Sequence, residues 1–484
     1  MQKCIALILI TMLLLTACSG LVKEESIPTT SDTTADAAFL VGFGEADITP
    51  DFQVDLAGYG NNATRLSTGF KTYIYAHVLA LRDAEGSTAL LISMDAGSCS
   101  ATFTQKLIQW AEAEHGIPRE NFMLSASHQH SCPSLSTDYA KFAEKRIKAA
   151  IDDAIADLTP AEMYINSAET TALSFVRNYV MNNGTIYGDG YGSSASGIKC
   201  HESESDKEMQ LVKFTREGKQ PVVVVNFQAH PHMGTSSNDT NISADWPGIM
   251  RQTVQEELGY HVMYFSGASG NLNSTSRITE ENVSTDFRHH GQRAANYVID
   301  AEDSYIKVET GKVIGKQQTI AYATNHENDH LIEQANYVHG IRQTQGLDAG
   351  VSAAGMYEEI HSVYHASAIV GQYAAGATRE LTIGAISIGD VAFTAHSYEM
   401  FDTNGMELKQ GTVGNEAYPA EDQLENPYKM TVITTMTNTS NGYIPSRIGC
   451  TNGGYSTDIT YFAYGTAEIL VGDYLALLQE LHGQ

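Results

Sequence analysis

Short apolar runs that alternate with amphipathic stretches are the main pattern along this chain. Runs of four to eight apolar residues predict buried β-strands, and apolar positions spaced three and four residues apart predict helices. The segment 216–219, Arg-Glu-Gly-Lys, separates two such runs and predicts a hairpin. Strands are predicted at 89–94, 122–126, 209–214, 221–227, 261–265 and 430–436, with two more within 381–394 around Gly389-Asp390. Helices are predicted at 103–114, 138–158, 245–258, 287–305, 355–369 and 465–481.

This order of strands and helices indicates the fold class. Alternation over several hundred residues is typical of an α/β protein in which helices flank a large mixed β-sheet core. The segment 39–484 contains no internal repeat and no linker rich in Pro, Gly and Ser. We therefore expect 39–484 to form a single domain.

The first 38 residues differ in composition from the rest of the chain. Lys3, an apolar run over 5–15 and the small residues that follow are typical of a secretory signal peptide, predicted here over 1–17. The ending Leu15-Thr16-Ala17-Cys18 resembles a bacterial lipobox, which implies that Cys18 is lipidated. The alternative is an ordinary signal with an incidental cysteine. Residues 18–38 are polar, without an apolar period, and predict a disordered tether.

Charge limits the partners of this protein. The chain has 484 residues with 57 acidic and 29 basic side chains, so its formal net charge is −28. Nucleic-acid binding needs clustered Lys and Arg that neutralise phosphates, and this charge therefore argues against a nucleic-acid partner. Attraction to an anionic membrane surface is disfavoured as well. We expect the lipid on Cys18 to anchor the protein in a bacterial cell envelope, outside the cytoplasm, either periplasmic or surface-exposed.

The cysteines give no metal motif. Two of the six belong to the N-terminal segment, and the others contain no C-x-x-C, which argues against a zinc ribbon. An oxidising compartment would allow one or two disulfides among these four, with three full pairings that the spacing does not distinguish. The four are Cys99, Cys132, Cys200 and Cys450.

Polar side chains follow five of the predicted strands. Two H-x-H units, 128–130 and 230–232, each come directly after an apolar run. Glu399 and Tyr443 follow two later strands, and the segment 267–271 follows another. A single histidine in such a place is more often structural than a metal ligand. The argument for a site therefore rests on the repetition of the H-x-H unit. Because ligand sites in α/β proteins gather at the carboxyl ends of strands, we predict that these groups meet.

The residue types in these clusters suit a hydrolytic metal ion. Zinc binds imidazole nitrogens and carboxylate oxygens, and a catalytic zinc keeps one position open for water. His128, His230 and Glu399 make such a two-histidine, one-carboxylate set. The metal lowers the pKa of its water to about 7 and polarises a carbonyl group, so the prediction is metal-assisted hydrolysis.

Two other catalytic patterns are weaker. The segment 326–330, His-Glu-Asn-Asp-His, matches the H-E-x-x-H motif of zinc proteases, which needs both histidines on one helical face. Asn and Asp disfavour a helix interior, so a polar loop or a helix start is the expected structure there. No G-x-S-x-G nucleophile elbow occurs, and 267–270, Gly-Ala-Ser-Gly, is one residue short of one.

Several short motifs resemble, in order, those of neutral/alkaline non-lysosomal ceramidases, from about residue 40 to 480. Individually they are short, but their order along the chain is specific. The matching segments are 41–44 (Val-Gly-Phe-Gly), 47–50 (Asp-Ile-Thr-Pro), 58–60 (Gly-Tyr-Gly), 125–133 (Ser-Ala-Ser-His-Gln-His-Ser-Cys-Pro), 226–231 (Asn-Phe-Gln-Ala-His-Pro), 243–245 (Ser-Ala-Asp), 398–401 (Tyr-Glu-Met-Phe), 442–445 (Gly-Tyr-Ile-Pro) and 453–455 (Gly-Gly-Tyr).

The resemblance implies a zinc-dependent amidohydrolase acting on linear amide bonds, with a role for each matching position. The implied zinc ligands are His128, His230, Glu399 and Tyr443. His130 and Tyr455 are implied catalytic groups that flank the substrate carbonyl and polarise it or handle protons. Arg177, within 176–179 (Val-Arg-Asn-Tyr), is implied to lie near the substrate.

Two departures from the family pattern bear on the substrate. Family members carry a proposed catalytic Ser followed by Pro where this chain has Asn273, with Ser274 one residue later. A zinc-bound hydroxide needs no serine, so Asn271 and Asn273 are predicted instead to hold water or to donate to the oxyanion. Long family members also add a C-terminal β-sandwich, which we do not expect after the helix 465–481.

We therefore expect a zinc hydrolase that cleaves an amide bond in a ceramide-like N-acyl lipid or in a smaller amide or ester. The attacking group would be a zinc-bound hydroxide. Two alternatives stay open. One is a zinc protease that uses the H-E-x-x-H segment, and the other is a surface lipoprotein with a binding role on an inactive hydrolase fold.

Overall fold

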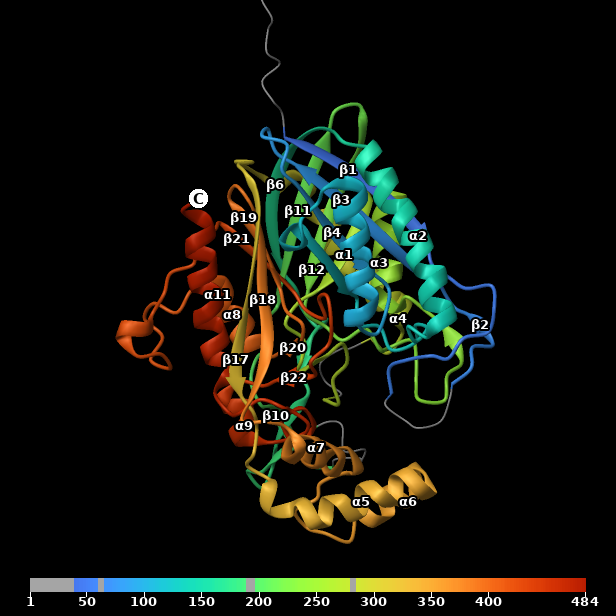
Figure 1. The fold of residues 1–484 in the computed structure, drawn as a ribbon, viewed down its shortest axis with the longest axis vertical. Helices are drawn as coiled ribbons and strands as arrows, with labels where there is room; N and C mark the ends of the chain where they lie inside the picture. Colours follow the sequence, from blue (N-terminus) through green and yellow to red (C-terminus); the bar gives the residue numbers. More distant parts are fainter. Residues whose placement is uncertain (1–38, 60–64, 189–195, 279–283) are drawn as a thin grey trace, which may run out of the picture. The chain divides into compact units, whose positions relative to one another are not determined.

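The computed structural model describes residues 39–59, 65–188, 196–278 and 284–484. The predicted signal peptide 1–17, Cys18 and the tether 18–38 lie outside the described residues. Within the unit Ala37–Gln484, the described chain forms two stacked β-sheets with helices on both outer faces (Figure 1).

The larger sheet has nine strands and contains both parallel and antiparallel pairs, which confirms the predicted mixed sheet. The pairs β4–β5 and β12–β14 are parallel, and the others are antiparallel. In order across the sheet its strands are β14 (His261–Ser266), β12 (Lys219–Phe227), β11 (Glu208–Arg216), β6 (Thr159–Glu169), β1 (Leu40–Asp47), β3 (Tyr75–Arg82), β4 (Thr88–Met94) and β5 (Phe122–Ala126), with β16 (Ile306–Val308) beside β6.

A second sheet of four strands packs on the inner face of the first. It consists of β17 (Val313–Ala323), β18 (Thr378–Ile388), β19 (Val391–Ala395) and β21 (Met430–Thr434), with β19 and β21 parallel. The strands predicted within 381–394 and at 430–436 therefore exist, but they form a separate sheet. Their apolar pattern is that of any strand buried on both faces, so it does not tell which sheet a strand joins.

Helices cover both outer faces and complete four layers (Figure 1). The larger sheet is covered by α1 (Ala101–His115), α2 (Thr137–Ala156), α3 (Asp245–Leu258) and α4 (Phe287–Asp300). The smaller sheet is covered by α8 (Asp402–Gln410) and α11 (Thr466–His482). The core between the sheets includes Leu91, Val224, Phe265, Ile386 and Phe393, all at most 1% exposed.

Strand β12 is buried on both faces, which explains the continuous apolar run in its sequence. Val222 and Val224 face the second sheet, whereas Val223 and Val225 face helices α3 and α4. A strand buried on both faces has no polar side, and this removes the alternation expected of a surface strand.

Helix α2 lies unusually close to β1, and two glycines make this possible. A Cβ at Gly42 would lie 1.8 Å from the carbonyl oxygen of Ala154, and one at Gly44 would lie 2.0 Å from that of Ala150. Only glycine fits at these two positions. The same glycines interrupt the apolar run of β1, and the sequence pattern did not predict this strand.

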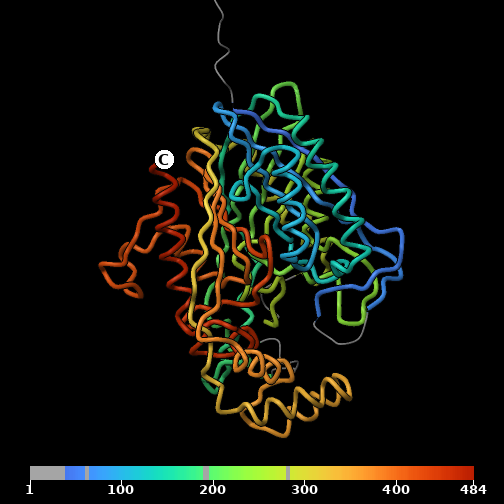
Figure 2. Tube along the Cα trace, in the orientation of Figure 1, coloured from blue at the N-terminus to red at the C-terminus, as the bar shows by residue number. Residues whose placement is uncertain are grey.

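A helical insert, which we define as residues 324–377, connects β17 to β18. Figure 2 shows the chain leaving the end of one strand and returning beside it, since Ala323 pairs with Thr378. The insert contains α5 (Ile332–Gln345), α6 (Leu347–Ala354) and α7 (Val363–Ala374), which pack around a core of their own. The single helix predicted at 355–369 is wrong in its bounds, because Ser362 caps α7 by accepting from the His365 N–H at 3.0 Å.

Short elements surround the carboxyl ends of the central strands. The predicted helix 287–305 ends at Asp300, before a short 3-10 turn over Glu302–Ser304. The remaining short strands are β2 (Gly69–Phe70), β7 (Phe175–Val176), β8 (Asn178–Met181), β9 (Ile186–Gly188), β10 (Ile198–His201), β13 (Asn241–Ile242), β15 (Leu272–Asn273), β20 (Glu399–Met400) and β22 (Tyr443–Ile444), and the short helices are α9 (Arg447–Asn452) and α10 (Tyr455–Asp458).

The four cysteines of the described chain are all unpaired, so the structure contains none of the disulfides that the sequence allowed. Cys99, Cys132 and Cys450 are buried, and Cys200 is exposed. No helix in the described ranges has the length and the hydropathy needed to cross a membrane.

One buried histidine makes the stability of this fold depend on pH. His290, on α4, packs against Trp246 with ring centroids 5.4 Å apart. Neither of its ring nitrogens has a hydrogen-bond partner among the described residues. Burial therefore lowers the pKa of the imidazole from 6.5 to about 3.

We expect His290 to contribute to acid unfolding. Between pH 6.5 and 3 the unfolded chain binds a proton that the folded chain excludes, so this contribution is complete above pH 6.5 and is lost as the pH falls. From pH 7 to pH 5 the wild type should lose about 2 kcal/mol more than His290→Leu. Urea denaturation at both pH values measures this difference, and His289→Leu, at the exposed neighbouring position, is the control. Equal losses in wild type and His290→Leu would contradict the prediction.

Candidate active site

The twist of the larger sheet brings the ends of distant strands together. Strands β5 and β12 run in opposite directions in the sheet order, with six strand-to-strand steps between them. Each step rotates the strand direction by about 20–25°, so six steps turn it through more than about 120°. The carboxyl ends of β5 and β12 consequently point toward one region. The Ser93 hydroxyl on β4 bonds to the Tyr264 carbonyl on β14, which shows how far the sheet curls.

His128 leaves the end of β5 in a backbone conformation that is rare for residues other than glycine. Its φ is 63°, in the left-handed region. Histidine is one of the few residues that adopt this conformation with some frequency, and such outliers cluster at functional sites. In this conformation the Nδ1 atom lies 2.7 Å from the carbonyl oxygen of Gly97. Nδ1–H donates to that oxygen, so the lone pair of Nε2 faces the cavity.

His230 follows β12 and is held in the same manner. Its Nδ1 atom lies 3.0 Å from the Ser269 carbonyl oxygen and 3.1 Å from that of Leu272. Its own carbonyl oxygen accepts a hydrogen bond of 2.6 Å from the Ser274 hydroxyl. Backbone carbonyls that bind Nδ1–H fix the tautomer and leave Nε2 to bind a metal.

Glu399 and Tyr443 arrive together because β19 and β21 are parallel neighbours. After a short break the two chains pair again as β20 and β22, with Glu399 directly opposite Tyr443. The Glu399 N–H donates to the carbonyl oxygen of Gly442 at 2.8 Å. The structure therefore places both residues just beyond the ends of two neighbouring strands, directly opposite each other.

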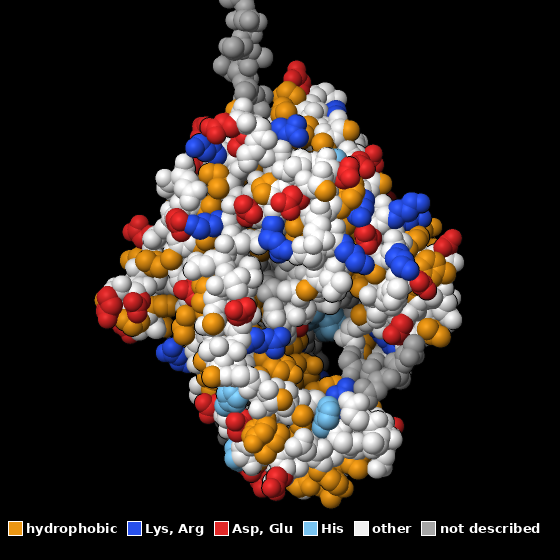
Figure 3. Space-filling model, viewed as in Figure 1, with side chains coloured by type: hydrophobic (Ala, Val, Ile, Leu, Met, Phe, Trp, Pro, Cys, Tyr) orange, Lys and Arg blue, Asp and Glu red, His pale blue; other side chains and the backbone are white. Residues whose placement is uncertain are grey.

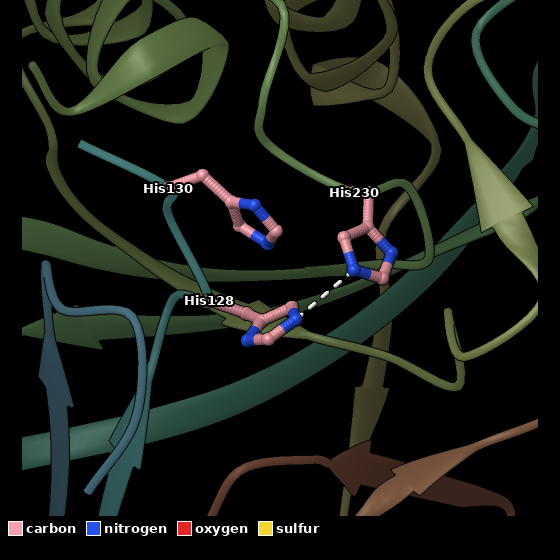
Figure 4. A group of neighbouring side chains, drawn as sticks. All are labelled: His128, His130 and His230. Atoms are coloured by element: carbon pink, nitrogen blue, oxygen red, sulfur yellow. Dashed lines mark hydrogen bonds between the residues drawn. The ribbon is translucent and has the colours of Figure 1, made fainter. Parts of the chain in front are cut away.

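Three ligand-type atoms form a compact triangle at the centre of the site. The two Nε2 atoms of His128 and His230 lie 3.0 Å apart (Figure 4). Oε2 of Glu399 lies 3.2 Å from the first and 3.3 Å from the second. Tetrahedral zinc with bonds of 2.0–2.1 Å holds its ligand atoms about 3.3–3.4 Å apart. The triangle therefore fits one zinc ion with little movement.

Electrostatics favour a positive charge between these three atoms. Burial opposes ionisation of Glu399, but His128 and His230 hold the pKa of its carboxyl well below the usual range. Burial opposes protonation of His128 as well, and Glu399 outweighs this effect and raises the pKa of the imidazole. Burial lowers the pKa of His230 to about 4. Two imidazole lone pairs beside a buried carboxylate repel one another unless a cation lies between them.

A cavity of about 570 Å³ opens over the triangle. Figure 3 shows a hollow on this face with histidine surface at its edge. His130 and Tyr455 both line the cavity, as do Arg177 and Asn273. The ring of His130 lies 5.1 Å from that of His128 and 5.4 Å from that of His230, and neither of its nitrogens has a partner among the described residues. The three histidine rings converge in Figure 4.

Arg177 and the two tyrosines form the opposite wall. The Arg177 guanidinium lies 5.3 Å from the centre of the Tyr443 ring, and that ring lies 6.0 Å from Tyr455. Burial, followed by the charge of Glu399, raises the pKa of Tyr455 to about 12 and also raises the pKa of Tyr443 well above its usual value. Both phenols therefore keep their protons at neutral pH. The role of Tyr443 as a fourth zinc ligand stays a prediction.

The two asparagines predicted near the substrate differ in their placement. Asn273 lines the cavity and bridges to the backbone of His230. Asn271 does not line it, because its side chain donates to Asp402 at 2.7 Å and accepts from the Asp402 N–H at 2.9 Å. Its backbone oxygen instead accepts from the N–H of Arg177 at 2.9 Å. Asn271 thus supports the wall of the cavity rather than facing the substrate.

The H-E-x-x-H segment has none of the geometry that a zinc protease needs. His326 and Asn328 lie before the first helical turn, a 3-10 turn over Asp329–Leu331, and α5 begins only at Ile332. His326 pairs with Asp329 at 3.0 Å. His330 approaches Glu359 at 3.7 Å. The two histidines contact different carboxylates, and the segment is a polar loop that leads into a helix start, as expected.

Several residues of the cavity wall were not assigned a role from the sequence. Tyr59 belongs to the motif 58–60, whose last residue lies outside the described ranges, and its ring packs edge-on against His130 at 5.4 Å. His232 is the second histidine of its H-x-H unit and contacts His130. Tyr364 comes from the helical insert, far away in sequence. The H-x-H spacing could have indicated His232, whereas no local signal marks Tyr364.

Comparison with known proteins agrees with this arrangement. Residues 39–368, more than half of the chain, match the family described as neutral/alkaline non-lysosomal ceramidase, N-terminal. Neutral ceramidase 2 of Arabidopsis thaliana is 24% identical over 236 residues, covering 45% of this chain and 30% of that protein. The neutral ceramidase of Oryza sativa subsp. japonica is 25% identical over 240 residues, covering 45% and 29%. The chain thus spans about 30% of the length of these curated relatives.

Solved structures share the fold. The crystal structure of the neutral ceramidase from Pseudomonas aeruginosa superposes with a TM-score of 0.67 at 16% identity, covering 92% of this chain and 75% of that one. A ceramidase complexed with C2 gives a TM-score of 0.65 at the same identity. The match over 39–368, with the strand-end histidines in place, shows that this chain belongs to the neutral/alkaline non-lysosomal ceramidase family.

Proposed function

We propose that the protein is a zinc-dependent hydrolase that cleaves the amide bond of a ceramide-like N-acyl lipid or of a smaller amide. The observation that carries this proposal is the triangle of His128, His230 and Glu399, with sides of 3.0, 3.2 and 3.3 Å. Family membership supports the amide as the bond that is cleaved. Relatives named neutral ceramidase suggest the lipid-like substrate.

The triangle residues would hold the metal, and the carbonyls behind them keep the two imidazoles in the required tautomer. A zinc ion at this site would supply an activated water and would polarise the substrate carbonyl. Glu399 contributes the negative charge that a divalent cation needs in a buried site. The Nδ1–H bonds of His128 and His230 keep both rings from rotating during turnover.

The other cavity residues would stabilise and orient the reacting carbonyl. Tyr455 keeps its phenolic proton at neutral pH, so it can donate a hydrogen bond to the oxygen that becomes negative. His130 lines the same cavity, and its ring nitrogens bond to no other described residue, so the unprotonated nitrogen would accept a proton and return it. Arg177, half-buried and permanently charged, contacts the Tyr443 ring and adds positive potential to the same wall. Asn273 would position water or the amide.

The shape of the cavity fits an amide with an apolar substituent. Its walls combine the polar groups of the triangle with apolar surface from Tyr59, Tyr364, Met436 and Ile459. Such a mixture of one polar centre and apolar walls is typical of sites that bind amphipathic small molecules. An N-acyl chain would lie against the apolar part while the amide faces the metal ligands.

The proposal is tested with a panel of N-acyl amides and esters, ceramide included, assayed before and after chelation. We expect hydrolysis of at least one amide, loss of activity with the chelator and recovery with added Zn²⁺. Failure to turn over any substrate would favour the inactive binding lipoprotein. His128→Ala should lose the zinc of the triangle while His326→Ala keeps it, and the reverse result would favour the protease.

Replacing Tyr455 by Phe should lower kcat without removing the metal. Loss of one hydrogen bond to a developing oxyanion costs roughly 10²–10³ in kcat, with a smaller change in KM. Steady-state kinetics combined with metal analysis measures both effects. Tyr461→Phe, outside the cavity lining, is the control. An unchanged kcat in Tyr455→Phe would show that the phenol takes no part in the reaction.

We also propose that lipid on Cys18 anchors the enzyme at a bacterial membrane, outside the cytoplasm. The support is the sequence Leu15-Thr16-Ala17-Cys18 behind an apolar run. Incorporation of a labelled fatty acid in the producing cell tests this proposal. Label that persists in Cys18→Ala would contradict it.

A further inference from the structure

A second group of metal-ligand side chains lies outside the triangle. His361 and His365 belong to the helical insert, and Asp458 ends the short helix α10 that starts with Tyr455. The ligand atoms of these three residues all lie within 4.8 Å of one another. Nδ1 of His361 is 2.8 Å from Oδ2 of Asp458, and the two imidazole rings stack with centroids 4.8 Å apart.

Asp458 is a buried carboxylate with no lysine or arginine beside it in the described chain. Only 7% of the residue is exposed, and its one recorded ion pair is with His361. Burial raises the pKa of its carboxyl to about 7. An isolated carboxylate in such surroundings is costly, and a cation shared with the two imidazoles would offset that cost.

The surroundings of His365 fix the tautomer of its imidazole ring. The residue is 1% exposed, and its Nε2 atom lies 3.3 Å from the Asn328 amide group. The Nδ1 atom accepts a long hydrogen bond of 3.3 Å from the His361 N–H, and exchanging the oxygen and nitrogen of the Asn328 amide lets Asn328 accept from Nε2–H. A metal at Nδ1 would replace that long backbone bond. Asn328 lies in the middle of the H-E-x-x-H segment, whose histidines bind elsewhere. This placement gives the segment a supporting role.

We propose that His361, His365 and Asp458 form a second divalent-cation site, suited to Zn²⁺, that fastens the helical insert to the helix carrying Tyr455. Two imidazoles and a carboxylate are a ligand set that zinc prefers, with water completing the coordination. The side chain of His361 is 51% exposed, so it has room to adjust to the metal and admits solvent to the fourth position.

A metal at this second site would influence the proposed active site through two residues of the cavity wall. Tyr364 lies between the two histidines in sequence, and its ring packs edge-on against Tyr455 at 6.2 Å and 88°. Both tyrosines line the cavity of the proposed active site. A metal that joins α7 to α10 would fix the distance between these two rings.

Zinc stoichiometry tests the proposal. The chelator-treated full chain is dialysed against buffered Zn²⁺ and its metal content is measured. We expect two equivalents in wild type and in His330→Gln, an exposed histidine of the same insert that serves as control. Asp458→Asn and His361→Gln should each bind one equivalent. His361→Cys should again bind two, because a thiolate also ligates zinc.

Zinc binding at the second site can be tested separately from the function proposed for the triangle. His128→Ala should remove one equivalent and leave the second, which Asp458→Asn then removes. If the triangle binds no zinc but the second site does, wild type should bind one equivalent of zinc, and Asp458→Asn should remove it. The second site is overturned if Asp458→Asn and wild type bind equal amounts of zinc, or if His361→Cys behaves as His361→Gln does.

Discussion

Replacing Glu399 by Gln is expected to lower amide hydrolysis by at least about 10³-fold and to weaken binding of zinc at the triangle. The substitution preserves shape but removes the only negative charge among the three ligand atoms. Two neutral imidazoles then face an amide that binds divalent zinc poorly. Steady-state assays of the best substrate, together with zinc content after dialysis, measure both losses.

A matched control separates this effect from a general disturbance. Glu407, on α8, also accepts hydrogen bonds inside the domain but lies outside the cavity lining, so Glu407→Gln should keep both zinc and activity. Circular dichroism should be unchanged in both variants. A Glu399→Gln protein that retains the full zinc content and the turnover of wild type would rule out the triangle as the catalytic centre.

The position of the site was predictable because its signals are local. His128 and His230 each follow an apolar run in an H-x-H unit, and strand ends gather ligands in α/β proteins. Glu399 and Tyr443 each follow an apolar run as well, and the parallel pairing of their two strands brings them together in the fold. The chain also carries the family motifs in order, so each residue had a candidate role before the geometry was known.

The remaining features depend on contacts that no local pattern encodes. Tyr364 reaches the cavity from an insert that packs on its own core, so its neighbours in sequence say nothing of Tyr455. Asn271 was predicted to face water or substrate, and only the fold shows that Asp402 occupies its side chain. The left-handed backbone of His128 and its bond to Gly97 are likewise consequences of tertiary packing.

The assignment of strands to sheets is likewise not encoded in local sequence patterns. Strands within 381–394 have the apolar composition of those in the larger sheet, yet they form a second layer. The strands β1 and β3 were missed for a different reason. Glycines that admit α2 interrupt β1, and β3 holds His77, which is 4% exposed and pairs with Glu45 at 3.2 Å. A buried polar residue breaks the apolar run on which such predictions depend.

A buried ion pair ties the helices to the sheet directly behind the site. Arg251, on α3, donates to both carboxylate oxygens of Asp95, one of them at 2.9 Å, and both residues are at most 6% exposed. Asp95 directly follows β4 and also accepts from the Tyr75 N–H at 2.9 Å. Two residues later, the carbonyl of Gly97 holds His128. The pair therefore supports both the fold and a metal ligand.

Removing the cation of this pair should be among the most destabilising single changes in the domain. Arg251→Met leaves the Asp95 carboxylate buried and uncompensated, which costs about 3–5 kcal/mol. The double variant Asp95→Asn with Arg251→Met keeps an acceptor for Tyr75 but removes the charge, so it should recover part of that loss. Urea denaturation of both variants measures the difference. Glu144→Gln, in a helix-surface pair with Lys148, is the control and should cost less than about 0.5 kcal/mol. If Arg251→Met were no less stable than the double variant, the arginine would not be needed to stabilise the buried Asp95 carboxylate.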